Sequence, residues 1–133
     1  MIVVDTSAVV AILLTEPEAV PFAELIEASD AAISAGSLTE TLRVMMLRRG
    51  AAAMPHVWTL VRSFRVRVVE MDEAQVQLAD EGMRRFGIGR VTPPAALNFG
   101  DLFAYALARH LDAPLLFKGD DFSLTDLRPA FGP

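Results

Sequence analysis

The chain has 133 residues, an apolar content of 53% and a net charge of −5, which predicts one domain with a sizeable core. It has no Cys and only two His, which excludes disulfides, thiolate zinc sites and cysteine nucleophiles and argues against a histidine-rich metal site. No apolar run approaches the roughly 18 residues that span a bilayer. The N-terminus lacks the features of a signal peptide, so we expect a cytoplasmic protein with no membrane segment.

Charge and hydropathy also bear on partners. The net negative charge argues against a general nucleic-acid binder, because phosphate neutralisation dominates that affinity. The eleven Arg and one Lys nevertheless suit local phosphate recognition, although high-GC codon usage explains the same Arg bias equally well. The apolar excess predicts a partner surface or an interface between copies of the chain. Two of the predicted helices are more hydrophobic than ordinary surface helices, and core packing is the alternative for most of their apolar residues. The candidates for a partner surface on them are Leu42, Val44, Met45, Met46, Leu47, Val57 and Trp58.

Short, apolar, β-branched runs alternate with segments whose apolar residues recur at helical spacing. Gly and Pro punctuate the segment 87–98, which predicts a loop. The strands are expected at 2–5, 31–35, 65–71 and within 113–120. The helices are expected at 6–14, 16–29, 37–50, 51–64, 72–87 and 99–111, with a last short helix or turn at 121–127.

This alternation runs through the chain without a repeat, a linker or a low-complexity segment. Short strands that are apolar on both faces indicate a mainly parallel sheet covered by helices on both sides. The predicted fold is therefore a three-layer α/β/α sandwich formed by a single domain, residues 1–133. In such folds ligands bind beyond the carboxyl ends of the strands, so residues that follow a strand are the candidates for a site.

Acidic residues occupy these positions. Asp5 ends the first strand, and Glu40 lies early in the helix that follows the second strand. Asp101 lies in the first turn of the helix that leads into the fourth strand, and Asp120 and Asp121 follow that strand directly. Parallel strands place their carboxyl ends at one edge, so these acids are expected to converge there.

Each acid also has a local explanation as a helix cap. Asp5 can cap the helix that it precedes, Ser37 and Glu40 fit a capping box, and Asn98 with Asp101 is a weaker variant. Together, however, the acids would repel one another in one pocket unless a cation compensated them. An oxygen-only set suits Mg²⁺ or Mn²⁺, and such ions can activate water against a phosphodiester.

Four stretches, VVDTSAVVAIL, SAGSLTETLRV, ALNFGDLFAYALA and PLLFKGDDFSLTDL, resemble the PIN domain, and closely the VapC-type toxins of bacterial toxin–antitoxin pairs. The resemblance covers nearly the whole chain in the right order. It implies a sheet in the order 3-2-1-4-5 with the first strand central. It also implies a magnesium-dependent endoribonuclease that acts on transfer or ribosomal RNA, forms a homodimer and is neutralised by a VapB-type antitoxin.

The resemblance also assigns residues. It puts Asp5, Glu40 and Asp101 on the metal and a fourth acid in KGDD. Gly119 occupies a position where some members carry an acid, so Asp120 and Asp121 compete for that role, with Asp120 slightly favoured. Two further assignments place Ser7 as a small polar residue near the ion and Arg43 as a possible contact to the RNA backbone. The implied reaction uses water activated by the metal.

Two other functions remain open from the sequence, a receiver domain and a silent binding module, and a third, a phosphatase, does not fit it. A phosphoacceptor receiver domain would use Asp72 after the third strand and Lys118 after the fourth, but it lacks an acidic pair after the first strand. A haloacid-dehalogenase phosphatase needs Asp-x-Asp where this chain has DTS. A catalytically silent PIN-like binding module would use the acids only as caps. Asp126 is an intermediate case, because it is close to the acids that follow the fourth strand but lies one helical turn further on.

Overall fold

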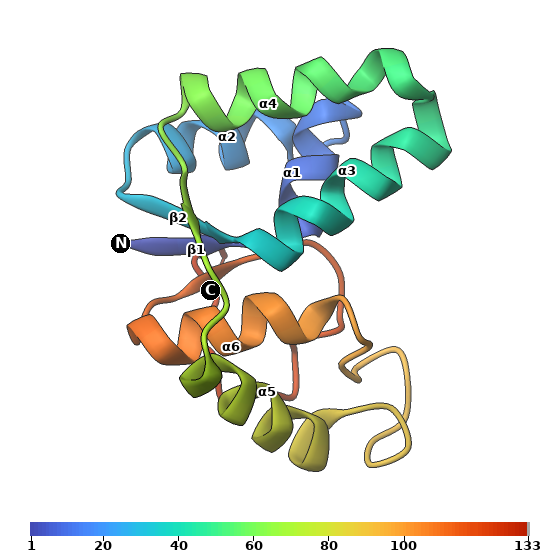
Figure 1. The fold of residues 1–133 in the computed structure, drawn as a ribbon, viewed down its shortest axis with the longest axis vertical. Coiled ribbons are helices and arrows are strands. Elements are labelled where there is room, and N and C mark those ends of the chain that lie inside the picture. The colour runs from blue at the N-terminus through green and yellow to red at the C-terminus, as the bar shows by residue number, and fades with distance from the viewer. Residues whose placement is uncertain (133) are drawn as a thin grey trace.

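Four short strands form a parallel sheet in the order β3-β2-β1-β4 in the computed structural model, which describes residues 1–132 (Figure 1). The register pairs Ile2 with Ala31 and Val3 with Leu115, which puts the first strand inside the sheet. The predicted α/β fold and the central first strand are thus confirmed. The strands are β1 (Ile2–Val4), β2 (Ala31–Ser34), β3 (Arg67–Val69) and β4 (Leu115–Leu116).

The expected fifth strand is reduced to a single bridge. Leu115 pairs in parallel with Pro129, through a bond from the Leu115 amide to the Arg128 carbonyl (2.9 Å) and one from the Ala130 amide to the Leu115 carbonyl (2.8 Å). Both bonds are made by the residues on either side of Pro129, so the proline nitrogen, which has no N–H to donate, faces away from β4, as expected at a sheet edge.

Within residues 1–132, six α-helices and one 3₁₀ turn accompany the sheet. Figure 1 shows α1, α2, α3 and α4 on one face and α5 and α6 on the other. This arrangement gives the predicted three layers. The helices are α1 (Thr6–Leu13), α2 (Ala19–Glu27), α3 (Ala35–Arg49), α4 (Met54–Ser63), α5 (Glu73–Phe86) and α6 (Asp101–Leu111), with the 3₁₀ turn η1 at Ala51–Ala53.

The start of α3 differs from the prediction. The Ser34 hydroxyl accepts a hydrogen bond from the Gly36 amide (3.2 Å), so Ser34 is the N-cap and the helix begins at Ala35. Ser37 therefore lies inside the first turn, and the expected Ser37–Glu40 capping box is wrong. The segment 121–127 forms turns and not a helix.

Alternate residues of the central strands serve two separate cores. Ile2, Val4 and Ile33 pack with α1–α4, whereas Val3 and Ala32 pack with α5 and α6. This explains why these strands read as continuous apolar runs, since both faces are buried. Among the helices of residues 1–132, none is both long enough and apolar enough to cross a membrane.

The two kinds of strand should respond differently to truncation. Replacing the fully buried Ile33 of β2 by Ala removes core contacts and should lower the free energy of unfolding by about 2–5 kcal/mol. The matched change Val68→Ala on the edge strand β3, where the side chain is half-exposed, should cost less than about 1 kcal/mol. Urea denaturation measures both, and similar losses would contradict the assignment of β3 to the edge.

Candidate active site

Asp5 directly follows β1, which ends at Val4. Its amide donates to the Leu116 carbonyl (2.9 Å), so the sheet fixes its backbone. Its Oδ2 accepts from the Ser7 amide (3.0 Å) and the Ser7 hydroxyl (2.6 Å), which makes Asp5 the predicted N-cap of α1. The other oxygen, Oδ1, is buried without a hydrogen-bond partner. Capping therefore uses only half of this carboxylate.

Ser7 connects Asp5 to the end of β4. Its hydroxyl donates to Asp5 and accepts from the Lys118 amide (3.0 Å). With its donor and one acceptor site engaged, the hydroxyl has a fixed orientation, and Asp5 cannot rotate without breaking both bonds from Ser7. Ser7 thus lies where the resemblance implied a small polar residue.

The surroundings of Asp5 favour its neutral form. Burial, with only 3% of the residue exposed, raises the pKa of Asp5 to about 6. The hydrogen bonds from Ser7 oppose this shift, and the negative charge of Glu40 adds to it. A buried carboxylate that nearby acids push toward protonation is a candidate for a functional group.

Asp101 occupies the first turn of α6 and is 7% exposed. Its Oδ2 accepts from the Asn98 amide (2.9 Å), and its own amide donates to Asn98 Oδ1 (3.0 Å). The predicted reciprocal cap is therefore present. Burial raises the pKa of Asp101 to about 8, and the negative charges of Asp5 and Asp121 and a hydrogen bond with Asp121 add to the shift.

Glu40 reaches the same place from α3. Its carboxylate lies against Gly100, where any Cβ would collide with it. Gly100 has ordinary helical angles (φ −62°, ψ −33°), so a glycine is required here by the close approach and not by the backbone conformation. This contact joins the start of α6 to α3 and brings Glu40 next to the Asp101 turn.

The two acids of KGDD take different positions. Gly119 has a φ of +101°, which favours glycine and turns the chain directly after Lys118. Asp120 is exposed, and its carbonyl accepts from the Ser123 amide (3.0 Å). Asp121 is half-buried, and its carboxyl interacts with Asp101. The structure therefore brings Asp121 into the acidic group and leaves Asp120 outside it.

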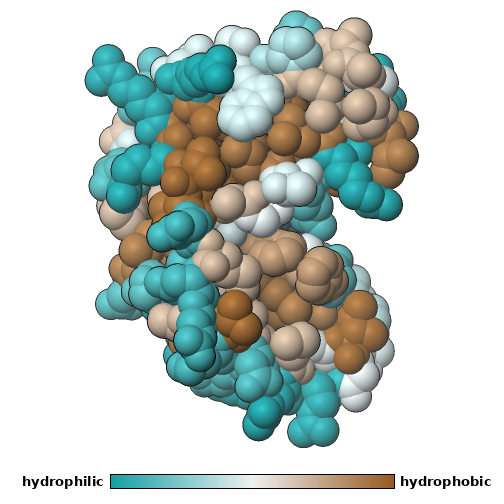
Figure 2. Space-filling view, viewed as in Figure 1, coloured by the Kyte–Doolittle hydropathy of each residue, from teal (hydrophilic) through white to brown (hydrophobic). Residues whose placement is uncertain are grey.

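A pocket of about 410 Å³ is lined by three of the predicted acids. Asp5, Glu40 and Asp101 line it, together with the cations Arg48 and Lys118. It lies between α1 and α3 on one side and the start of α6 on the other. Figure 2 shows an indentation of the surface between the part built on α1–α4 and the part built on α5, α6 and the loop before α6. The predicted convergence is thus observed for Asp5, which follows β1, for Glu40 on the helix after β2, and for Asp101 at the start of α6.

The donor set suits a hard cation, although the acids line the pocket without closing on one point. No three Asp, Glu or His side chains within residues 1–132 are arranged to hold an ion as they stand. Mutual repulsion opposes a closer approach of carboxylates that no cation bridges. The unpartnered Oδ1 of Asp5 and the oxygen-only chemistry of Asp5, Glu40 and Asp101 fit Mg²⁺ or Mn²⁺.

An ion-paired lysine at the pocket was not predicted. Lys118 Nζ lies 3.0 Å from Glu18 Oε2 and 3.4 Å from Glu16 Oε1. These pairs lower the pKa of Glu18 and raise that of Lys118. The sequence could have indicated Lys118 as a pocket residue, because it lies at the end of the predicted fourth strand, where residues of a site are expected. Glu16 and Glu18 gave none, because only the tertiary fold brings their loop to this strand end.

A second hollow, of about 420 Å³, adjoins the acidic pocket. Glu40 lines both, and Arg43 and Phe99 lie in the second one. Phe99 is 75% exposed and contacts Phe103 edge to face, with 5.2 Å between the ring centroids. Arg43 is therefore next to the acids and not among them, while Arg48, one and a half helical turns further along α3, lines the acidic pocket itself.

Comparison with known proteins identifies the family. The model of the PIN domain matches residues 2–127. The chain belongs to the PIN-domain family. Ribonuclease VapC42 of Mycobacterium tuberculosis is 39% identical over 96% of this chain and 98% of its own, and Ribonuclease VapC of Mycolicibacterium smegmatis is 41% identical over 94% and 96%. The resemblance to VapC-type proteins is thus confirmed.

A solved structure shares the fold. The crystal structure of Mycobacterium tuberculosis VapC20, described as a sarcin-ricin loop cleaving toxin, superposes with a TM-score of 0.75, covers 96% of each chain and is 21% identical. The receiver-domain alternative is excluded by the family, and Asp72, its required phosphoacceptor, instead caps α5 by accepting from the Gln75 amide (3.0 Å).

The raised pKa values predict how stability depends on pH. The fold raises the pKa of Asp5 to about 6 and that of Asp101 to about 8 from 3.8. At pH values between the unfolded pKa of 3.8 and these raised values, the folded state binds more protons than the unfolded chain. The free energy of unfolding should therefore fall as the pH rises from about 4 to about 8. Thermal melts in EDTA measure this slope.

Asp101→Asn is the control for that measurement. It removes one titrating group while keeping an oxygen that can accept from the Asn98 amide. The melting temperature of the variant should decline less over the same pH range, because one carboxyl with a raised pKa no longer titrates. An unchanged slope would contradict the raised pKa of Asp101.

The contact between Gly100 and Glu40 predicts a compensating pair of mutations. Gly100→Ala should lower the free energy of unfolding by about 1–3 kcal/mol, because the new Cβ collides with the Glu40 carboxylate. In a Glu40→Ala background the same change should be neutral or slightly stabilising, since the backbone angles suit alanine. Equal costs in both backgrounds, measured by chemical denaturation, would argue against the contact.

Proposed function

We propose that the protein is a metal-dependent endoribonuclease of the VapC type, which hydrolyses phosphodiester bonds of transfer or ribosomal RNA. The observation that carries the proposal is Asp5: a buried carboxylate with one free oxygen in a pocket shared with Glu40 and Asp101. Relatives that are 39–41% identical over nearly the whole chain are named ribonucleases, which supports the same reaction.

Asp5, Glu40 and Asp101 would hold Mg²⁺ or Mn²⁺, with Asp121 as the fourth acid. Asp120, the other candidate, is exposed and would serve only if the turn at Gly119 rearranged. When bound, the ion supplies positive charge that activates water and stabilises the oxygen that leaves the phosphodiester. Asp5 and Asp101, whose pKa values are raised, would give up their protons when the cation bound.

The protein's own groups orient the site and attract the substrate. Ser7 holds Oδ2 of Asp5 so that Oδ1 is left for a ligand, and the Asn98 amide fixes one oxygen of Asp101. The N-terminal ends of α1 and α6 meet at the pocket and add partial positive charge for phosphate. The reaction needs no side-chain nucleophile, consistent with a chain that has no Cys.

Two arginines are the candidates for contacts to the RNA backbone. Arg48 lines the acidic pocket and Arg43 the adjoining hollow, so both can reach phosphates next to the one that is cleaved. A local pair of cations is compatible with a chain of net charge −5, because it needs to bind RNA only at the site. Each such contact adds to the salt dependence of binding.

The exposed apolar residues support protein partners, a VapB-type antitoxin and a second copy of the chain. Met45 and Val57, expected as candidates for this surface, belong to the core, whereas Met46, Leu47 and Trp58 are exposed. A hollow of about 510 Å³ is lined mainly by apolar residues of α1, α3 and η1, and it is where we expect an apolar segment of the antitoxin to bind.

The cleavage reaction provides the test. Purified protein incubated with a pool of structured RNAs should produce defined 5′ ends with Mg²⁺ and none with EDTA. Asp5→Asn should reduce the rate by at least about 100-fold, the scale on which loss of a catalytic charge acts. Mapping the cleavage ends by sequencing would also identify the RNA target.

Asp80→Asn is the matched control, because Asp80 forms an exposed ion pair with Arg84 on α5 (2.9 Å) and lies outside the pocket. It should cleave at the rate of the unmodified protein. Cleavage that persists in EDTA, or that Asp5→Asn leaves intact, would overturn the mechanism. Full binding of an antitoxin without any cleavage would instead support a silent binding module.

A further inference from the structure

One face of α6 connects the acidic pocket with the C-terminal segment. Asp101, Tyr105 and Arg109 are spaced four residues apart and so lie along one side of the helix. Asp101 interacts with Asp121 at the start of this face. At its other end Tyr105 and Arg109 contact Asp126, five residues after Asp121. The same helix face thus holds the C-terminal segment at two points.

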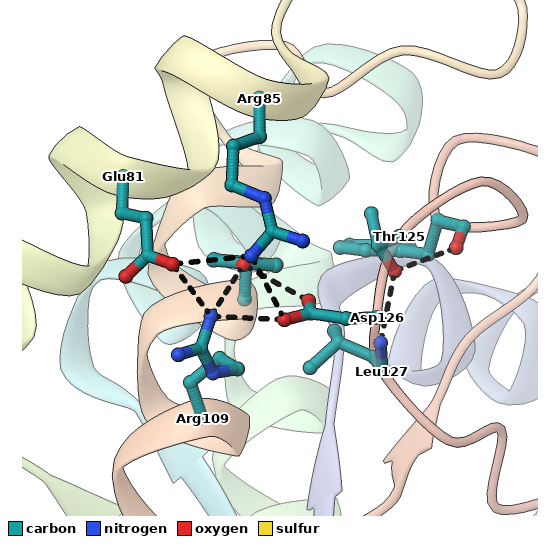
Figure 3. Close-up of polar contacts among 8 residues, drawn as sticks. Glu81, Arg85, Arg109, Thr125, Asp126 and Leu127 are labelled. Carbon is teal, nitrogen blue, oxygen red and sulfur yellow. Dashed lines mark hydrogen bonds and ion pairs between the residues drawn. The ribbon is translucent and has the colours of Figure 1, made fainter.

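The second point is a network of side chains around Asp126 (Figure 3). The hydroxyl of Tyr105 donates to Asp126 Oδ1 (3.0 Å), and Arg109 Nη1 donates to Asp126 Oδ2 (3.0 Å) and to the Tyr105 oxygen (2.8 Å). Glu81 and Arg85 of α5 complete the network, with Arg85 at 3.3 Å from Asp126 and Glu81 at 3.6 Å from Arg109. Both oxygens of Asp126 are therefore engaged.

The segment between the two points has little freedom. Phe122 is buried and packs on Phe117, with 5.1 Å between the ring centroids. The Ser123 hydroxyl donates to the Asp120 carbonyl (2.7 Å), and the Thr125 hydroxyl donates to the Phe122 carbonyl (2.8 Å). These hydrogen bonds form successive turns between Asp121 and Asp126, which limit how far the two residues can move apart. No regular strand does so, since pairing beside β4 is a single bridge.

We propose that Asp126 is a positioning residue, which holds Asp121 beside Asp101 by fixing the C-terminal segment to α6. The role rests on the proposed metal site and adds to it a residue outside the pocket. The network differs from ordinary surface pairs of this protein. Tyr105 is fully buried, and the side chains of Arg109 and Asp126 are 27% and 32% exposed, against 77% and 51% for Arg84 and Asp80.

Binding of Mn²⁺ alone, measured by electron paramagnetic resonance, tests this role without activity. Asp126→Asn removes the charge that pairs with Arg109 and should weaken Mn²⁺ binding about 10-fold, the scale on which groups that orient metal ligands act. Asp121→Asn should weaken it by a similar factor. Because Asp126 acts through Asp121, adding Asp126→Asn to Asp121→Asn should change the affinity little further.

Two further variants exclude a purely structural effect. Tyr105→Phe keeps the ring packing and removes one donor to Asp126, so it should weaken Mn²⁺ binding in the same direction while the protein remains folded. Asp80→Asn, which breaks an exposed pair on α5, should leave Mn²⁺ binding unchanged. If Asp126→Asn fails to fold, Tyr105→Phe with and without Asp121→Asn forms the same cycle.

The outcomes separate this inference from the proposed function. Equal losses of Mn²⁺ affinity with and without Asp121→Asn would show that Asp126 does not act through Asp121, and would overturn the positioning role alone. An unchanged affinity in both Asp126→Asn and Tyr105→Phe would do the same. Failure of the unmodified protein to bind Mn²⁺ would overturn the metal site and, with it, this role.

Discussion

The burial of the Asp5 carboxylate is the constraint on which the rest of the site depends. β1 lies inside the sheet and is covered on both faces, so Asp5, which directly follows its last residue, is buried although it is acidic. One oxygen is satisfied by Ser7 and the other has no partner. Burying a charge in this way is costly unless a cation or a proton compensates it. The strand that stabilises the fold thus creates the demand for positive charge at the site.

The neighbouring acids add negative charge and so increase the need for a cation or a proton beside Asp5. Glu40 is held against Gly100, and Asp101 is fixed by the Asn98 turn, so neither can move far from Asp5. Burial raises the pKa of both aspartates, and nearby negative charge adds to each shift, from Glu40 for Asp5 and from Asp5 and Asp121 for Asp101. Asp5 and Asp101 retain protons when no metal is bound, so binding of a divalent cation is expected to release protons into solution.

The C-terminal segment shows how side chains replace a missing strand. In a sheet with a full fifth strand, a ladder of backbone bonds would fix the residues that follow β4. Here a single bridge at Pro129 remains, and the segment is held by the buried ring of Phe122 and by Asp126. The geometry of the acidic pocket on this side therefore depends on residues that neither line it nor touch a substrate.

The sequence by itself determined the alternation of strands and helices, the three layers, and the acids at the strand ends, because periodicity and capping act within a few residues of chain. The caps at Asp5 and at Asn98–Asp101 are of this local kind. Only the tertiary structure decided which KGDD acid joins Asp101, that Lys118 pairs with the loop after α1, and that Ser34 is the N-cap of α3. The first two depend on contacts between segments far apart in the chain. The start of α3 could not be predicted because Ser34 and Ser37 both fit the preference for serine at an N-cap. Ser34 takes this position because β2 ends there.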